Sequence, residues 1–360
     1  MAFTSSELES IANATLAWFI DKGQLHEQSI QSKPIVDKMV RARKSFASGD
    51  GTLSLGIKGI YGADGNDDHL VGYTHDEQVG FYTPENIMRA NFNWKEMHMG
   101  FTMTHTELKK DGLSVVDTNG ESTRNHSQRD RTVLAGLLQN KLDDFAEMYA
   151  RSLNDLFWGD GTDDPQGIAG IQSIIVDDPT AGSVGGIDAS LAQNSFWRNR
   201  ARTADHEAAG GYGPVTSDTA NGGALYETLQ HEFRQLRRYG GQPNTFMAGS
   251  DFIQAMEREM KANGYYSQTG FTSGGDASIG DLRFQGVSVM YDPTLDDLEL
   301  SKRAYIWDDR DIMLYAMQNE WNRQHSPARP HDRFVLYRSV TCTGQMVCRR
   351  RNSALVIDIA

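Results

Sequence analysis

The sequence predicts an α+β protein of two domains, and three features of the 360-residue chain lead to that fold class. An apolar stripe at helical spacing crosses residues 125–158, short helices and strands alternate through residues 173–330, and strand-like segments return near the C-terminus. Because typical domains have roughly 100 to 200 residues, a chain of this length accommodates two of them.

The composition is that of an acidic chain rich in glycine. It has 48 acidic and 35 basic residues, a formal net charge of −13, and 35 glycines against nine prolines. An acidic chain is repelled at long range by nucleic acid and by anionic membranes. No apolar run reaches the roughly 18 residues that a membrane span requires, and a signal peptide is not evident. We therefore expect neither sequence-specific DNA binding nor a membrane location.

Residues 1–51 are expected to form an N-terminal arm of two short helices. A capping box at residues 6–9 opens the first helix, and Gly23 stands where a helix ends. The second helix is expected from Pro34 to about Lys44, because proline suits the first turn of a helix.

Residues 52–93 alternate weakly and are rich in glycine, which indicates a long, exposed β-hairpin. Its expected strands are Ile57 to Tyr61 and Leu70 to Tyr73, with an acidic, glycine-containing turn at residues 62–68. The weak core pattern favours an extended loop, and an ordinary edge hairpin of one globule is the alternative.

Residues 94–172 are expected to hold a strand, Trp94 to Glu107, and then the long helix from about 125 to 158. That helix would be roughly 50 Å long at about 1.5 Å per residue, which exceeds the width of most compact domains. Its apolar stripe consists of Leu134, Leu138, Leu142, Phe145, Tyr149, Leu153 and Leu156. The opposite side is charged, as in an amphipathic helix.

Residues 173–330 are expected to form a compact second domain of mixed helices and strands. The expected strands are Ile171 to Val176, Thr245 to Ala248, Val287 to Tyr291, Ala304 to Trp307 and Ile312 to Ala316; the expected helices are Leu225 to Leu236 and Ser250 to Lys261. The polar stretch from Ala201 to Gly223 is expected to be a mobile surface loop.

Residues 331–360 are expected to return as strands, Phe334 to Cys348 and Ala354 to Ile359, because β-branched and aromatic residues partly alternate there. The two strands would form a terminal hairpin around the arginine-rich turn and pair with Trp94 to Glu107.

The motifs of catalytic sites are incomplete in this sequence, so we expect no catalytic residue and no cofactor. There is no glycine-rich phosphate loop that ends in Lys-Ser or Lys-Thr. His231 and Glu232 open like a zinc-protease helix, but Gln235 stands where the second histidine is needed. Ser183 and Ser250 lack the flanking glycines of a nucleophile elbow and suit ordinary turns and caps.

No metal site is expected either. Asp160, Asp163 and Asp164 lack the spacing of a calcium loop and its closing Glu, and suit a solvated turn. The same holds for the acidic hairpin tip with His69 and His75. His98 and His105 would lie on opposite faces of one strand. Cys342 and Cys348 are six residues apart in a predicted strand, too far to form a disulfide, and are expected to be buried thiols.

The order of these elements resembles the major capsid proteins of tailed double-stranded DNA bacteriophages over nearly the whole chain. The most characteristic part is the long helix followed by Trp158-Gly159-Asp160-Gly161, Pro165-Gln166-Gly167-Ile168, Gly185-Gly186-Ile187-Asp188 and Trp197-Arg198-Asn199. In that family a spine helix runs into a glycine-containing turn at the entrance to a second domain. The resemblance therefore implies a tailed-phage major capsid fold with arm, extended hairpin, peripheral domain, axial domain (173–330) and returning strands.

The resemblance also implies a structural virion protein rather than an enzyme. Its main partner would be itself, in the hexamers and pentamers of an icosahedral head that encloses double-stranded DNA without sequence specificity. Portal and scaffold proteins would be further partners, with a possible decoration protein. Assembly would take place in the host cytoplasm.

Contacts between subunits are expected at aromatic residues of the arm and hairpin and at the basic cluster near the C-terminus. The candidates are Trp18, Phe19, Tyr61, Tyr73, Phe81, Tyr82, Arg349, Arg350 and Arg351. For the aromatic residues the alternative is the subunit's own core, and for the arginines it is an exposed, hydrated turn. Acidic groups of another subunit are the preferred partners of the arginines, given the net charge.

Some capsid proteins cross-link their subunits through a lysine of the hairpin and an asparagine, but the match here is poor. Lys58 stands near the hairpin base, and Asn352 is only suggestive by position, so no cross-link is expected. Two other functions stay open: an encapsulin-like shell of a cellular nanocompartment, and a soluble α/β enzyme without recognisable motifs.

Overall fold

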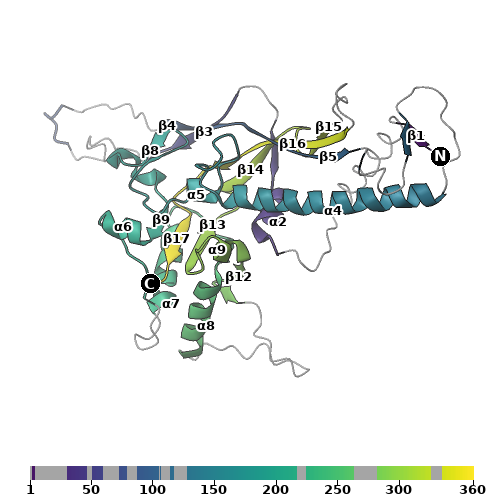
Figure 1. Cartoon of the computed structure of the whole chain (residues 1–360). Helices are drawn as coiled ribbons and strands as arrows, with labels where there is room; N and C mark the ends of the chain where they lie inside the picture. Colours follow the sequence, from purple (N-terminus) through teal and green to yellow (C-terminus); the bar gives the residue numbers. More distant parts are fainter. Residues whose placement is uncertain are drawn as a thin grey trace. The chain divides into compact units, whose positions relative to one another are not determined.

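Figure 1 shows a computed structural model of the chain, which divides into two compact units by its internal contacts. The first contains residues 1–31, 96–154 and 317–343, and the second contains residues 32–95, 155–316 and 344–360. The residues that the structure describes are 2–4, 31–46, 51–59, 73–78, 87–104, 106, 114–116, 128–216, 224–262, 282–325 and 335–360. Within these ranges no helix is long and apolar enough to cross a bilayer. The domain boundaries expected from the sequence stay a prediction.

The first unit is organised around the long helix α4, Gln128–Trp158, most of which it contains. Strand β16, Val335–Cys348, pairs with β5, Lys95–Thr104, and with β15, Arg323–His325 (Figure 1). A short parallel pair joins β1, Ala2–Thr4, to β6, Ser114–Val116. The long helix and the strand after residue 94 are thus confirmed, although the helix begins at Gln128.

The core of the first unit lies between α4 and this sheet. Phe145 of the helix packs against Val340 and Cys342 of β16. Around them lie the partly buried side chains of Met97, Met99, Phe101, Tyr149 and Trp321. The helical spacing of Phe145 and Tyr149 brings both rings to this core, where they stack with centroids 6.4 Å apart.

The second unit is built on a six-stranded sheet in the order β11-β12-β10-β13-β17-β9. These strands are Arg283–Phe284, Val287–Tyr291, Thr245–Ala248, Arg303–Trp307, Leu355–Asp358 and Arg200–Arg202. The middle strand β13 runs antiparallel to both neighbours, so that Thr245 pairs with Trp307 and Arg303 with Asp358. All four residues of β10 are buried, as expected of a strand covered on both faces.

One face of this sheet carries the main core of the second unit. Helices α7, Ala224–Arg237, and α8, Ser250–Ala262, supply its helical side. The fully buried residues include Leu225, Leu229, Phe233, Phe246, Phe252, Ala304, Ile306, Leu355 and Ile357. Both helices were expected from their apolar spacing, and the strands at Thr245, Val287, Ala304 and Ile312 are confirmed. The short helix α9, Pro293–Asp297, begins at its N-cap Asp292.

Helix α2, Pro34–Arg41, is fixed within the second unit. Ile35 and Met39 are buried, and the Lys38 ammonium donates to the Asn244 carbonyl at 3.3 Å and pairs with Asp309 at 3.2 Å. The expected helix therefore exists but ends three residues early. The next residues form strand β2, Lys44–Phe46, which pairs with β14, Ile312–Met317.

A two-stranded hairpin stands at the base of the expected extended loop. Strand β3, Thr52–Lys58, pairs antiparallel with β4, Ile87–Asn93, so that Thr52 faces Asn93. The paired strands thus lie further along the chain from the turn at residues 62–68 than the expected strands, Ile57 to Tyr61 and Leu70 to Tyr73. The tip at residues 62–68 lies outside the described residues, as does the first helix of the arm.

Two expectations about the strands are wrong. Ile171 to Val176 is not a strand, because Ile171–Ile174 forms the short helix α5. The C-terminal strands do not form a hairpin with each other: β16 pairs with β14, β15 and β5, whereas β17 pairs with β13 and β9. The arginine-rich segment between them therefore passes from one sheet to another.

Candidate functional site

The turn that follows α4 depends on glycine at close backbone contacts. A methyl group on Gly170 would lie 2.3 Å from the carbonyl oxygen of Phe157, and the Gly170 amide donates to the Gly159 carbonyl at 3.0 Å. Gly161 has φ +85°, in the left-handed region that favours glycine. These contacts fold the chain back over the helix end, as the glycine spacing in the sequence suggested.

Trp158, the last residue of α4, joins this turn to the sheet of the second unit. Its side chain is fully buried, its ring lies 5.2 Å from that of Tyr305, and its indole N–H donates to Asp292 Oδ2 at 3.0 Å. Asp292 also accepts the Thr294 amide at 3.0 Å. Burial raises the pKa of Asp292, although these hydrogen bonds favour its charged form.

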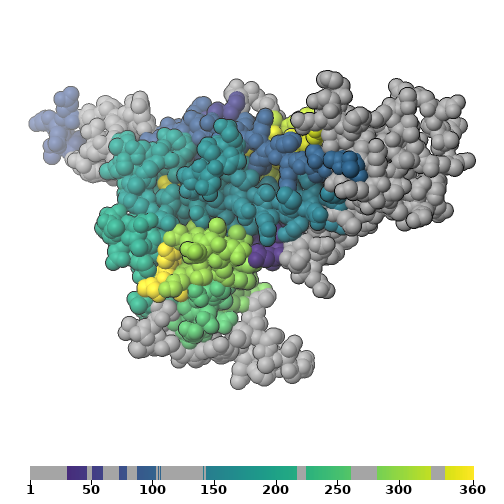
Figure 2. Space-filling view, in the orientation of Figure 1, coloured from purple at the N-terminus to yellow at the C-terminus, as the bar shows by residue number. Residues whose placement is uncertain are grey.

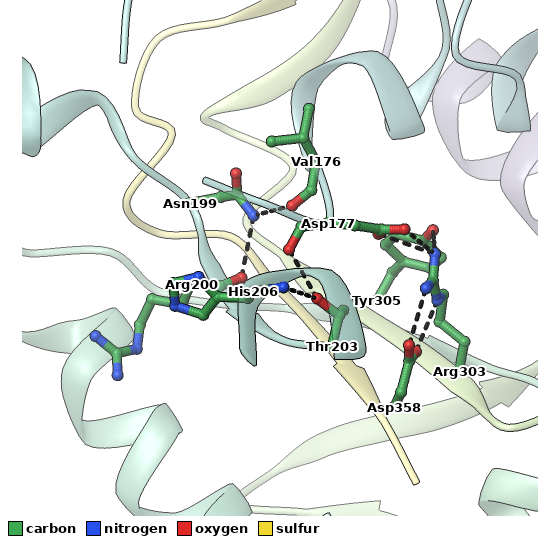
Figure 3. A network of polar contacts seen from close by, with 9 residues as sticks. All are labelled: Val176, Asp177, Asn199, Arg200, Thr203, His206, Arg303, Tyr305 and Asp358. Atoms are coloured by element: carbon green, nitrogen blue, oxygen red, sulfur yellow. Dashed lines mark hydrogen bonds and ion pairs between the residues drawn. The ribbon is translucent and has the colours of Figure 1, made fainter. Parts of the chain in front are cut away.

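A polar network centred on Arg303 ties three distant segments together (Figure 3). Its guanidinium donates to Asp358 at 2.7 and 2.8 Å, to Asp177 at 2.9 and 3.0 Å, and to the Tyr305 hydroxyl at 3.3 Å. Burial raises the pKa of Asp177 despite the nearby charge of Arg303. The network fixes strand β17 and the segment after α5 to strand β13.

The residues after Trp197 also form hydrogen bonds to the segment after α5, at the backbone of Val176 and Asp177. Asn199 Nδ2 donates to the Val176 carbonyl at 2.8 Å, and the Thr203 hydroxyl donates to the Asp177 carbonyl at 2.8 Å (Figure 3). Thr203 also caps helix α6, Ala204–Ala208, by accepting the His206 amide. The motif that closes on Asn199 therefore has a structural role.

Glu232 is buried in α7 and pairs with two arginines of strand β9. Arg200 donates to both of its carboxylate oxygens, and Arg202 Nε donates to Oε1 at 3.0 Å. Burial alone would raise the pKa of Glu232, but the bonds and charges of the two arginines outweigh burial and lower it. The expectation of a mobile loop from Ala201 to Gly223 is wrong for Ala201–Ala208, because β9 and α6 lie there.

The hairpin base is docked on a tight turn of the second unit. Strands β7, Ser183–Val184, and β8, Ile187–Asp188, are joined by Gly185 and Gly186, with φ +63° and +80°. The Asn91 amide of β4 donates to the Gly185 carbonyl at 2.8 Å. A methyl group on Gly185 would lie 3.0 Å from Cβ of Ala90, so only glycine lets the strand approach this closely.

The three consecutive arginines do not share one environment. Arg351 is fully buried and donates to the carbonyls of Ile174 at 2.6 Å and Trp197 at 3.2 Å. Burial lowers its pKa to about 10. The expectation that Arg351 contacts another subunit is therefore wrong. Arg349 is exposed and donates to the Tyr315 hydroxyl at 2.5 Å, and Arg350 lies half-exposed at 3.9 Å from Asp311.

The other predicted contact residues are only partly described. Tyr73 is 69% exposed. Trp18, Phe19, Tyr61, Phe81 and Tyr82 lie outside the described residues. Ile87, at the start of β4, is 74% exposed and is a candidate that the sequence pattern did not reveal. Of the large apolar side chains that the structure describes, Ile87 and Tyr73 are the most exposed, and both belong to the segment 52–93.

The residues considered for chemistry lie in structural settings. Asp160 accepts the amide and hydroxyl of Thr162 at 2.8 and 2.7 Å, in a local turn. Ser183 begins β7, and Ser250 begins α8 with its amide bonded to Asp296. Within the described ranges, no group of three or more His, Cys, Asp and Glu side chains is placed to hold a metal ion. Cys342 and Cys348 are buried thiols, as expected.

Comparison with known proteins identifies the fold. No family model and no curated protein matches the chain. Among solved structures, it is similar to a chain of the capsid asymmetric unit of cyanophage A-1(L), with a TM-score of 0.65 and 14% identity over 94% of this chain and 96% of that one. It is also similar to the capsid of the empty GTA particle, with a TM-score of 0.53 and 9% identity over 94% of each chain. The chain therefore has the fold of these capsid subunits, and the expected tailed-phage major capsid fold is confirmed.

Proposed function

We propose that the protein is the major capsid protein of a tailed phage and that its copies assemble into a closed shell. The observation that carries the proposal is the likeness to a cyanophage capsid chain over 94% of this chain. The step from fold to function is made by analogy with these capsid chains. The polar networks around Arg303 and Glu232 link distant segments of the second unit, a structural role that agrees with a shell subunit.

In the mechanism that we propose, exposed segments of each subunit are buried against a neighbouring subunit during assembly. Tyr73 and Ile87 leave large apolar surfaces in solvent, at a cost that burial against a neighbour would remove. The hairpin base is held firmly by the turn at Gly185, so the hairpin can present these side chains outside its own subunit. The remaining aromatic candidates of the arm and hairpin would act in the same way.

The finer features belong to the same proposal. Hexamers and pentamers would close the shell through heterologous contacts, in which two different surfaces meet. The shell would enclose double-stranded DNA, whose repulsion from a chain of net charge −13 prevents tight binding to the wall. Portal, scaffold and decoration proteins would be partners in the host cytoplasm.

Electron microscopy of the purified, expressed protein tests this function. We expect closed particles of uniform size, and nuclease-resistant DNA inside particles taken from infected cells. Particles that instead hold a host enzyme bound by a short peptide would identify a nanocompartment shell. A protein that stays monomeric at high concentration, or a small stable oligomer with a ligand-binding pocket, would contradict the proposal.

A pair of variants tests the hairpin contacts. Tyr73→Ala with Ile87→Ala should leave the subunit folded but raise the concentration needed for assembly at least about tenfold, because each buried apolar side chain contributes roughly 1.5 to 3 kcal/mol. The matched control is Tyr212→Ala with Leu191→Ala, which truncates two exposed apolar side chains outside the hairpin. Equal assembly of the two variants would remove the hairpin from the mechanism.

A further inference from the structure

The central sheet of the second unit has ends of opposite charge. Strand β13 is antiparallel to β10 and β17, so the start of β10, the end of β13 and the start of β17 lie at one end of the sheet. The end of β10, the end of β12 and the start of β13 lie at the other. The loops at the first end carry mainly arginine, and those at the second carry mainly carboxylates.

The basic end consists of Arg237, Arg238, Arg310, Arg349 and Arg350. All five belong to loops or helix ends beside Thr245, Trp307 or Leu355, and all but the half-exposed Arg350 are exposed. Contacts between these loops place them together: a methyl group on Gly240 would lie 3.5 Å from the Arg350 guanidinium, and the Gln242 amide donates to Asp308. A cavity of about 430 Å³ opens here, lined by residues 240–243 and Arg237.

The carboxylates near the basic end are already used inside the subunit. Asp308 accepts the backbone amides of Gln242 and Arg310, Asp309 pairs with Lys38, and Asp311 accepts the Ser353 hydroxyl. Within the described part of the chain, the side chains of Arg237, Arg238 and Arg310 have no carboxylate partner, although Arg238 lies over the ring of exposed Tyr239. The basic end therefore offers unpaired guanidinium groups beside an exposed aromatic ring.

The acidic end consists of Asp251, Asp296, Asp297 and Glu299, opposed by the exposed Lys302. The Ser250 amide and the Tyr291 hydroxyl donate to Asp296 at 2.9 and 2.7 Å, which joins the start of α8 to the end of β12. Asp297 and Glu299 are exposed, and Leu298 between them is 45% exposed. Asp297 is the last residue of α9 (residues 293–297), and Leu298 and Glu299 follow it; Figure 2 shows on its face the light green part of the chain to which this segment belongs.

We propose that the basic end of one copy binds the acidic end of a second copy, head to tail, within the shell; this rests on the proposed function. The two ends are separated by strands such as the four-residue β10, a distance of roughly 13 Å at about 3.3 Å per residue. Because the Debye length in physiological salt is about 8 Å, each end presents its own field to solvent. A surface pair of this kind is heterologous and can repeat from copy to copy around a ring.

A second copy fits the basic end better than nucleic acid does. Each copy that brings a basic end also brings an acidic end, whereas the net charge of −13 opposes the approach of a polyanion. The exposed side chains of Tyr239 and Leu298 give each end an apolar group that burial between copies would cover.

Charge reversal tests this interface. Arg238→Glu with Arg310→Glu reverses part of the basic end, and Asp297→Lys with Glu299→Lys reverses part of the acidic end. Each pair alone should lower the yield of sedimentable particles about tenfold, since several weak surface pairs are lost together. The chain that carries all four substitutions should regain assembly, because the charges are again complementary. The control, Arg151→Glu with Arg258→Glu, reverses two exposed arginines elsewhere and should assemble normally.

The outcomes separate this inference from the proposed function. Loss with each pair and recovery with all four supports the head-to-tail contact. Normal assembly of both pairs, or loss without recovery in a soluble and folded four-fold variant, would overturn it and leave the shell function in place. If the basic-end pair assembles normally but packages less DNA, the partner is nucleic acid and the inference is wrong. If the unchanged protein forms no shell, the proposed function fails and the interface falls with it.

Discussion

Gly185 and Gly186 provide a direct test of how the hairpin is held. Both have positive φ, +63° and +80°, so replacing either by alanine costs about 1 kcal/mol of backbone strain. Only at Gly185 would the added methyl group also press on β4, at 3.0 Å from Ala90 Cβ and 3.1 Å from Phe92 Cζ. At Gly186 it would meet no atom within 4 Å. Comparing the alanine variants at Gly185 and Gly186 therefore distinguishes the effect of strain in the turn from the effect of losing the contact with β4.

The expected difference between the two variants follows from overpacking, which costs typically about 1 to 3 kcal/mol. If β4 moves away, the Asn91 amide loses its bond to the Gly185 carbonyl. Exchange of that amide should then be roughly 5- to 150-fold faster in Gly185→Ala than in Gly186→Ala. Hydrogen exchange of a peptide covering residues 87–93 in the unassembled subunit measures this. Equal protection in both variants would refute the idea that the turn docks the hairpin.

Three other predictions concern buried groups of the second unit and the two thiols. Glu232→Gln should destabilise the unassembled subunit by about 2 to 3 kcal/mol at pH 7, less than a fully buried pair would lose because Arg200 is partly exposed. Since the folded pKa of Glu232 is lowered, its contribution is present above the unfolded pKa of about 4.5 and disappears as pH falls, so denaturant midpoints of the two proteins should converge in acid. Arg351→Met keeps much of the volume but leaves the Ile174 and Trp197 carbonyls without donors, and should cost about 2 to 4 kcal/mol in the same denaturation assay; an unchanged midpoint would contradict this. Cys342 and Cys348 should react with iodoacetamide at pH 8 at least about 100-fold more slowly in the folded protein than in urea, because both are buried and burial raises the pKa of the Cys348 thiol to about 12.

The sequence predicted the elements whose stability comes from their own side-chain pattern. Helix α4 has an apolar stripe of many turns, and strand β10 has three consecutive apolar residues between clear helix signals. In these segments the local preference and the tertiary burial agree, so periodicity suffices. Ile171–Ile174 shows the limit of this approach, since a short segment with apolar residues at both ends reads equally well as strand or helix.

Strand β9 could not be predicted because its partners are distant. Arg200 and Arg202 look like residues of a polar loop, and only the buried Glu232, about thirty positions later, makes a strand with two arginines favourable there. The exposed Ile87 was missed for the opposite reason, because one apolar residue in a weakly alternating strand gives no sign of which face it will occupy.

The arginines at 349–351 show why position in the sheet matters more than the run of charge itself. A terminal hairpin would have placed all three in one exposed turn. Instead the chain leaves β16, paired with β14, and enters β17 beside β13, so residues 349–354 connect two different sheets. Arg351 stays inside, where its planar fork reaches two carbonyls at once, while Arg349 and Arg350 remain at the end of the sheet. The same run thus supplies an internal anchor and part of the charged surface that we assign to a second copy.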